Sequence, residues 1–248
     1  MKTFVKDKLQ VEIFENRTLM GEAAAKDISA KIKELLSKKQ GINMIFAAAP
    51  SQNDVLKALV EDETIEWDRV NAYHMDEYIG LDKNAPQGFG NFLKAHIFGL
   101  VPFKSVNYID ITATDPEKEA ERYGKLLKPN PTDIVVMGIG ENGHIAFNEP
   151  GTPFGSVTHI VDLTESTIKD NSRLFKSIDE VPRQAFTMGL KNIMNAKKIL
   201  ILANGANKAK AVYGLVKGEV TENVPASILQ LHPDCTLVCD EAAAELIG

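Results

Sequence analysis

The sequence predicts an α/β protein, a single Rossmann-like domain over residues 1–248 with an open, mostly parallel sheet and helices on both faces. Short apolar runs alternate with longer segments whose apolar residues recur at helical spacing. Strands that alternate with helices imply parallel pairing through right-handed crossovers. No linker, internal repeat or low-complexity tract interrupts the series, and 248 residues suffice for one large core.

The predicted strands are short runs, mostly apolar and rich in β-branched residues, as expected for strands buried between two layers of helices. Glycine or polar residues bound most of them. In chain order, the segments predicted to be extended are 11–14, 42–46, 67–74, 106–111, 134–137, 157–163, 186–190, 198–203 and 235–239.

The segments between these strands carry the helical signals. Residues 18–38 place apolar side chains at helical spacing and end in a lysine-rich stretch that suits the helix dipole. Ser51 is expected to be the N-cap of the next helix, because its hydroxyl can accept a free amide N–H. The remaining predictions are helices over 90–98 and 115–127, a helix or turn over 164–173, a helix from about 208 to 217 and a short helix over 241–247.

Composition narrows the class of partner. The formal net charge of −6 argues against nucleic acids and anionic membrane surfaces. No stretch of 18 apolar residues occurs, and residues 1–8 lack the apolar core of a signal peptide. We therefore expect small-molecule partners, no nucleic acid, no membrane and a cytoplasmic location, with the oligomeric state left open.

The two cysteines support the same location. Cys235 and Cys239 lie four residues apart in one predicted strand, so they point to the same face but lie too far apart for a disulfide. We expect two buried thiols, which fit a reducing compartment.

A polar loop follows the strand predicted at 134–137. Gly138 and Gly140 permit a tight turn there, although a Gly-x-Gly alone is weak evidence for a cofactor. The loop gathers an imidazole, a carboxylate and two amides, supplied by Asn142, His144, Asn148 and Glu149. Open α/β sheets bind ligands at the carboxyl ends of their strands, so this loop is a candidate catalytic site. A structural turn with a surface histidine is the alternative.

Two further strand ends carry polar residues. Ser51 follows the strand at 42–46 and is either a simple cap or part of a phosphate-binding helix start. Asp76 and Glu77 stand where the strand at 67–74 meets a loop, and adjacent carboxylates there are usually solvated. Held inside a cleft, one of them would have a raised pKa and serve as a general base. Residues 82–90, with two glycines and a proline, are expected to be mobile.

Two cations are candidates for binding an anion. The Arg173 guanidinium matches a phosphate in bidentate geometry. Lys208 lies in the first turn of a predicted helix, where a positive charge opposes the dipole unless it binds an anion. The sequence contains no metal-ligand spacing, nucleophile elbow or glycine-lysine phosphate loop. The expected chemistry is therefore acid/base catalysis on a phosphorylated substrate without metal or cofactor.

Four segments carry a more specific signal. Residues 75–81 (MDEYIGL), 138–150 (GIGENGHIAFNEP), 171–173 (NSR) and 229–233 (LQLHP) closely resemble motifs of the glucosamine-6-phosphate deaminases. The similarity runs over nearly the whole chain. The shared fold also admits 6-phosphogluconolactonases and non-catalytic sugar-phosphate sensor domains.

The resemblance implies a reaction and a set of residue roles. Glucosamine 6-phosphate and water would give fructose 6-phosphate and ammonia without a metal or cofactor, with galactosamine 6-phosphate as the alternative substrate. Asp76 matches the base that moves a proton from C2 to C1. His144 matches the ring-opening acid/base, and Glu149 matches the carboxylate that orients it. The phosphate-binding residues match Ser51, Arg173 and Lys208.

Three departures from the family pattern modify these expectations. Asn142 stands where many members carry aspartate, so it can hold His144 by hydrogen bonds but not by charge. The phosphate loop reads AAPSQ over 48–52 in place of Thr-Gly-Gly-Ser/Thr-Pro, which limits backbone approach and removes the Pro50 amide donor. His159 and Val161 replace basic residues used by regulated members, so activation by an acetylated sugar phosphate is not expected.

Overall fold

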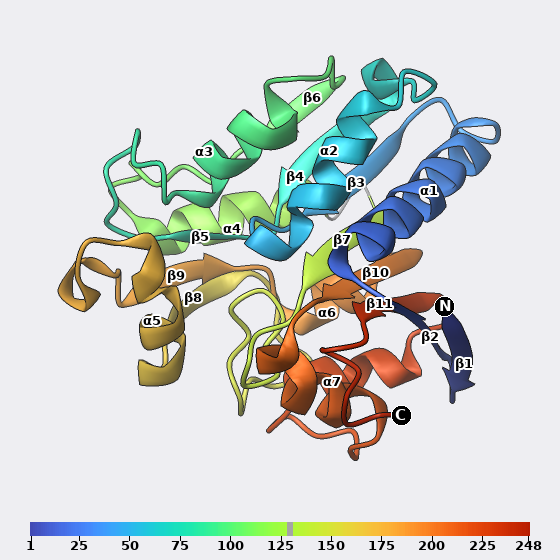
Figure 1. Ribbon diagram of the computed structural model, residues 1–248. Coiled ribbons are helices and arrows are strands. Elements are labelled where there is room, and N and C mark those ends of the chain that lie inside the picture. The colour runs from blue at the N-terminus through green and yellow to red at the C-terminus, as the bar shows by residue number, and fades with distance from the viewer. Residues whose placement is uncertain (128–130) are drawn as a thin grey trace.

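The computed structural model describes residues 1–127 and 131–248 (Figure 1). Its strands are β1 (Lys2–Lys6), β2 (Leu9–Phe14), β3 (Ile42–Phe46), β4 (Val70–His74), β5 (Asp76–Tyr78), β6 (Ser105–Asn107), β7 (Ile134–Gly138), β8 (His159–Asp162), β9 (Gln184–Thr187), β10 (Lys198–Ala203) and β11 (Cys235–Asp240). Its α-helices are α1 (Arg17–Leu36), α2 (Asn53–Glu61), α3 (Phe89–Leu93), α4 (Pro116–Leu127), α5 (Glu165–Asn171), α6 (Leu190–Met194) and α7 (Ala209–Val216).

Eight strands form one open sheet in the order β1-β2-β11-β10-β7-β3-β4-β6. Neighbouring strands pair in parallel, except that β1 runs antiparallel to β2 at the edge. The predicted fold class is confirmed. Because β7 lies between β10 and β3, the carboxyl ends of β10, β7, β3 and β4 stand side by side and bring the loops after them together.

Alternate side chains of the central strands enter two different apolar cores. On β7, Val135 and Met137 pack in the core that includes α4, α6 and α7. Ile134 and Val136 pack in the core that includes α1 and α2. Successive side chains of a strand point to opposite faces, so the sheet is covered by helices on both faces (Figure 1). This explains why the β7 and β10 sequences are mostly apolar rather than alternating.

A second, three-stranded antiparallel sheet has the order β5-β9-β8. It packs Tyr78 of β5 with Phe89 and Phe147 in a third, smaller apolar cluster. In Figure 1, β8, β9 and α5 lie together at one side of the main sheet. The β4–β5 turn therefore carries Asp76 out of the main sheet and directly into the small one.

Several local predictions are wrong. Asp76 and Glu77 lie in β5, not in a loop. Ser51 lies within a 3-10 turn, Pro50–Gln52, whose N-cap is Ala49, and it caps no helix. The predicted helix over 241–247 is a series of turns, and β1 was not predicted because most of its side chains are exposed.

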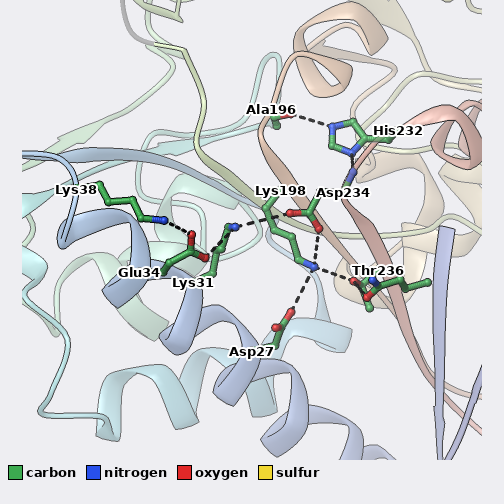
Figure 2. Close-up of polar contacts among 10 residues, drawn as sticks. Asp27, Lys31, Glu34, Lys38, Ala196, Lys198, His232, Asp234 and Thr236 are labelled. Carbon is green, nitrogen blue, oxygen red and sulfur yellow. Dashed lines mark hydrogen bonds and ion pairs between the residues drawn. The ribbon is translucent and has the colours of Figure 1, made fainter. Parts of the chain in front are cut away.

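The 229–233 segment lies away from the loops at the carboxyl ends of the central strands. It lies beside the amino ends of β10 and β11 (Figure 2). His232 is fully buried; its Nε2 lies 2.8 Å from Ala196 O, and its Nδ1 accepts the Asp234 N–H at 3.1 Å. Lys198 at the start of β10 donates to Asp234 at 3.0 Å and to Thr236 at 2.8 Å. Both ring nitrogens of His232 are thus occupied by backbone groups, which makes this motif a structural one.

Two further predictions from the sequence concern the state of the cysteines and the presence of membrane-spanning segments. Cys235 and Cys239 are both free and buried, as expected. Among the described residues, none of the helices has the length and apolar character needed to cross a membrane.

Candidate active site

A cavity of about 320 Å³ opens at the carboxyl ends of the central strands. Five of the candidate catalytic and phosphate-binding residues line it: Ser51, Asp76, His144, Arg173 and Lys208. Four of them follow β3, β4, β7 and β10, whose carboxyl ends the strand order brings to one edge of the sheet, and Arg173 follows α5. The cavity volume lies in the range typical of small-molecule sites.

His144 faces this cavity with Glu149 and Asn142 behind it. The Glu149 carboxylate Oε2 lies 3.6 Å from His144 Nδ1. Asn142 donates from Nδ2 to the same Oε2 at 2.8 Å, and its Oδ1 accepts the His144 backbone N–H at 3.1 Å. The amide therefore ties the backbone of the histidine to the carboxylate that faces its ring. Neither Asn142 nor Glu149 lines the cavity.

The Glu149 carboxylate is held in its ionised form. Burial raises its pKa, but the nearby His144, together with Thr167 and the hydrogen bond from Asn142, outweighs burial and brings the pKa to about 2. Thr167 also places its hydroxyl 3.5 Å from His144 Nδ1. A carboxylate facing Nδ1 favours the tautomer with its proton on that nitrogen and leaves Nε2 free to exchange protons.

Gly140 makes room for the imidazole. A Cβ atom at this position would lie 2.3 to 2.4 Å from three atoms of the His144 ring. The Gly140 N–H also donates to the His144 carbonyl at 2.9 Å, which closes the loop on itself. Gly140 is therefore explained by its packing against the histidine, and the prediction of a surface histidine at position 144 is wrong, because its side chain is only 16% exposed.

Asp76 is the buried carboxylate of the site, with 7% of its surface exposed. Burial, and then the nearby charge of Glu77, raise its pKa well above the usual value. Glu77 points elsewhere and accepts three backbone N–H groups, from Tyr78 at 2.9 Å, Phe89 at 2.9 Å and Gly90 at 2.8 Å. The common expectation that adjacent carboxylates are solvated does not hold here.

The backbone of Asp76 is held by a buried histidine. His74 Nδ1 lies 2.9 Å from the Asp76 carbonyl oxygen, and His74 Nε2 accepts the Ile109 N–H at 2.9 Å. The ring is therefore neutral, with its proton on Nδ1. Burial lowers its pKa to about 4, against the smaller effect of the Asp76 carbonyl.

Arg173 and Lys208 are the cations of this region of the cavity wall. Burial lowers the pKa of Lys208; nearby Glu141 opposes this effect and Arg173 adds to it. The hydroxyl of Ser51 accepts a hydrogen bond from Gln52 Nε2 at 3.2 Å and lies close to the backbone of Gly138. A negatively charged group of the ligand would meet this part of the wall.

Sequence reasoning missed several polar residues of the cavity, among them Arg17 and Thr167. Arg17 is the first residue of α1, and Thr167 lies within α5. No local pattern marks either of them, because tertiary packing alone brings their helices to this edge.

A buried carboxylate and a supported imidazole share one cavity at the strand ends of a parallel sheet. This arrangement is typical of the active site of an enzyme that acts on a small molecule. Residues 15–238 match the sequence profile of the glucosamine-6-phosphate isomerases/6-phosphogluconolactonase family. The chain belongs to this family.

Individual relatives agree with this assignment. A glucosamine-6-phosphate deaminase of Lactobacillus delbrueckii subsp. bulgaricus is 44% identical over 239 residues, which span 96% of this chain and 100% of that protein. One from Lactobacillus johnsonii is 53% identical over 183 residues, 74% of this chain and 77% of that protein.

The fold is also that of solved structures. A monomeric glucosamine-6-phosphate deaminase superposes with a TM-score of 0.89 at 35% identity, covering 95% of this chain and 99% of that one. A 6-phosphogluconolactonase from Thermotoga maritima gives a TM-score of 0.77 at 18% identity, over 94% of this chain and 100% of that one. The second likeness concerns the fold alone.

Proposed function

We propose that this chain is a glucosamine-6-phosphate deaminase, an enzyme that converts glucosamine 6-phosphate and water to fructose 6-phosphate and ammonia. One observation carries the proposal: the buried Asp76 carboxylate and the His144 imidazole line the same cavity as Arg173 and Lys208. The deaminases of 44% and 53% identity support it. In this proposal residues 1–248 act as one domain, and the two buried thiols favour the cytoplasm.

In the proposed mechanism His144 opens the sugar ring. Its Nε2 moves a proton from the anomeric hydroxyl to the ring oxygen and so gives the open-chain aldehyde. Glu149 supports this role because it faces Nδ1 at 3.6 Å and is ionised. Asn142 fixes the Glu149 carboxylate relative to the backbone of His144, because it forms a hydrogen bond with each of them.

Asp76 is the proposed base for the carbon-bound proton. It takes the proton from C2 and returns it to C1, which leaves an imine at C2 that water hydrolyses to the ketone and ammonia. A carboxylate of raised pKa is better matched to this transfer than an ordinary surface carboxylate. Its position at the start of β5, with the carbonyl fixed by His74, supports a defined orientation.

The phosphate of the substrate is proposed to bind at the cationic wall. Arg173 offers a planar set of N–H donors, and Lys208 offers a charge without a fixed direction. Ser51 offers a hydroxyl that lies within the wall of the same cavity. These three groups would fix the sugar so that its C1 and C2 atoms face Asp76.

The competing functions differ in what they need from Asp76. A 6-phosphogluconolactonase needs the loop histidine but no base for a carbon-bound proton, and a sugar-phosphate sensor needs neither. The burial of Asp76 inside the cavity favours the deaminase, because a buried carboxyl group of raised pKa in a cavity is suited to accept a proton in catalysis. The unusual 48–52 loop keeps galactosamine 6-phosphate as a second substrate to be tested.

The test is direct. The purified protein, treated with a chelator, is incubated with glucosamine 6-phosphate, galactosamine 6-phosphate or 6-phosphogluconolactone. Ammonia and the ketose phosphate are measured for the first two, and acid release for the third. Ammonia from glucosamine 6-phosphate is expected. Lactone hydrolysis without ammonia from either amino sugar would contradict the proposal.

A further inference from the structure

Arg17 lies on the cavity wall, although no motif includes it. Its Nε donates to the Asp54 carboxylate, and its Nη2 donates to the Pro50 carbonyl at 2.6 Å. A guanidinium has five N–H donors, so three remain after these two bonds. Nη1 makes no hydrogen bond to any residue that the structure describes.

Close packing of α1 against α2 places Asp54 beside Arg17. A Cβ atom on Gly21 would lie 2.6 Å from the Asp54 Cβ, so only glycine permits this approach. Arg17 and Gly21 are four residues apart on α1 and therefore lie on the same face of the helix. The ion pair holds the guanidinium beside the 48–52 loop before any ligand arrives, which lowers the entropy lost on binding.

Two positions of the 48–52 loop beside Arg17 offer no backbone N–H to an anion. Pro50 has no N–H, and the Gln52 N–H is already bonded to the Ala49 carbonyl at 2.9 Å. The Ala47 N–H is bonded to Val136 of the neighbouring strand at 2.9 Å. Pro50 and Gln52 therefore offer an anion no backbone N–H, and the guanidinium supplies N–H groups beside them.

We infer that Arg17 is a third cationic ligand of the substrate's phosphate, together with Arg173 and Lys208. The inference rests on the proposed function for the identity of the anion, a sugar phosphate. Phosphate oxygens accept two parallel N–H bonds from one guanidinium, which suits the unused face of Arg17. The Pro50 carbonyl that Arg17 holds belongs to the residue before Ser51, so the inferred ligand is adjacent to the serine of the same wall.

The first test compares Arg17→Gln with Lys57→Gln. Lys57 is an exposed residue of α2 that is paired with Glu61, so its variant removes the same charge outside the cavity. Calorimetry measures the Kd of inorganic phosphate, and ammonia release gives kcat and KM for glucosamine 6-phosphate. We expect Arg17→Gln to raise Kd and KM about tenfold or more, with little change in kcat. Lys57→Gln is expected to stay within about twofold of the wild type.

A second variant distinguishes a direct phosphate ligand at position 17 from a residue that only supports the loop. Asp54→Asn removes the ion pair but keeps the guanidinium, so it should raise the Kd of phosphate much less than Arg17→Gln does. Equal effects of the two variants would mean that Arg17 only supports the loop, and the inference would be wrong. An unchanged Kd in a folded Arg17→Gln protein would also overturn it.

The outcomes for Arg17 and for the proposed function can be told apart. Suppose that the wild type releases no ammonia but that Arg17→Gln binds inorganic phosphate with a higher Kd than the wild type does. The deaminase proposal then fails, and the role of Arg17 in anion binding is supported. If Arg17→Gln does not fold, Arg17→Lys takes its place. Lysine keeps the charge but not the planar fork, so a several-fold rise in Kd is expected and an unchanged Kd would contradict the inference.

Discussion

The side-chain amide of Asn142 donates to Glu149 Oε2 at 2.8 Å, while its oxygen accepts the backbone N–H of His144. A neutral group thus fills the position between the loop and the carboxylate. Glu149 is the carboxylate that faces the Nδ1 side of the imidazole, at 3.6 Å. The charge balance around His144 therefore depends on whether residue 142 is an amide or an acid.

Asn142→Asp should move the pH profile of the proposed reaction. A second carboxylate beside the ring favours the imidazolium over the neutral imidazole, so a higher pH is needed to populate the neutral form. We expect the acid limb of kcat/KM to shift upward by about one pH unit. Asn142→Ala, which removes the hydrogen bonds without adding charge, should lower the rate but leave that limb in place. The prediction is wrong if the acid limb of kcat/KM lies at the same pH in both variants as in the wild type.

Glu149→Gln should destabilise the protein in a pH-dependent manner. The folded-state pKa of Glu149, about 2, lies below the usual 4.5, so its stabilising effect is present above pH 4.5 and is lost as pH falls toward 2. At pH 7 the loss should be about 1 to 3 kcal/mol, the usual contribution of a hydrogen-bonded charged group. Urea unfolding at pH 7 and at pH 3.5 measures it, and the gap between variant and wild type should narrow at the lower pH.

The control for this prediction is Glu165→Gln. Glu165 has a side chain 86% exposed and paired with Arg183, so its replacement should change the free energy of unfolding by less than about 1 kcal/mol. A loss in Glu149→Gln that is equally large at both pH values would assign its effect to packing instead of charge.

The main sheet was predictable where strands are buried on both faces. The predictions for β3 and β10 match the structure to the residue, because both strands are short, mostly apolar segments in which every residue is buried. β1 could not be found in this way, since most of its side chains are exposed and its stability comes from pairing with β2. Ser51 was misplaced because the preceding Pro50 starts a 3-10 turn one residue before it.

The site was predictable to the extent that strand ends gather at one edge. Asp76 and His144 both follow strands of a parallel sheet, and topology alone brings them together. The burial of Asp76 was not predictable, because it depends on the second sheet that begins at this residue. Arg17 and Thr167 arrive on helices whose positions depend on packing, such as the contact that Gly21 allows with Asp54.

Gly140→Ala should disable the site without unfolding the protein. The new Cβ would overlap the His144 ring at 2.3 Å, so the imidazole must leave its position facing Glu149. We expect kcat/KM to fall by at least about 100-fold, the lower end of the contribution of a positioned acid/base group. Gly155→Ala is the matched control, because a Cβ there has no neighbour within 4 Å. Equal activity of the two variants would contradict the packing argument.

Asp76→Asn should remove the proposed base while preserving the cavity. The amide is close to the carboxylate in shape but cannot accept a proton, so turnover should fall by about 100-fold to 10,000-fold. Binding of inorganic phosphate should stay within about twofold, because the cationic residues are untouched. Ammonia release and calorimetry measure the two effects, and Asp68→Asn on the exposed turn before β4 is the control.

The same variant should also be more stable than the wild type at high pH. Burial and the charge of Glu77 raise the pKa of Asp76 in the folded protein, so the folded state binds this proton more tightly than the unfolded state. The wild type therefore loses stability as pH rises from about 4 through the raised pKa, and the Asp76→Asn variant, whose amide does not titrate, does not share that loss. Thermal unfolding of both proteins at pH 4 and pH 8 should show a larger advantage for the variant at pH 8. An advantage that does not grow with pH would mean that the carboxylate is ionised and solvated, which would remove the reason for its role as a base.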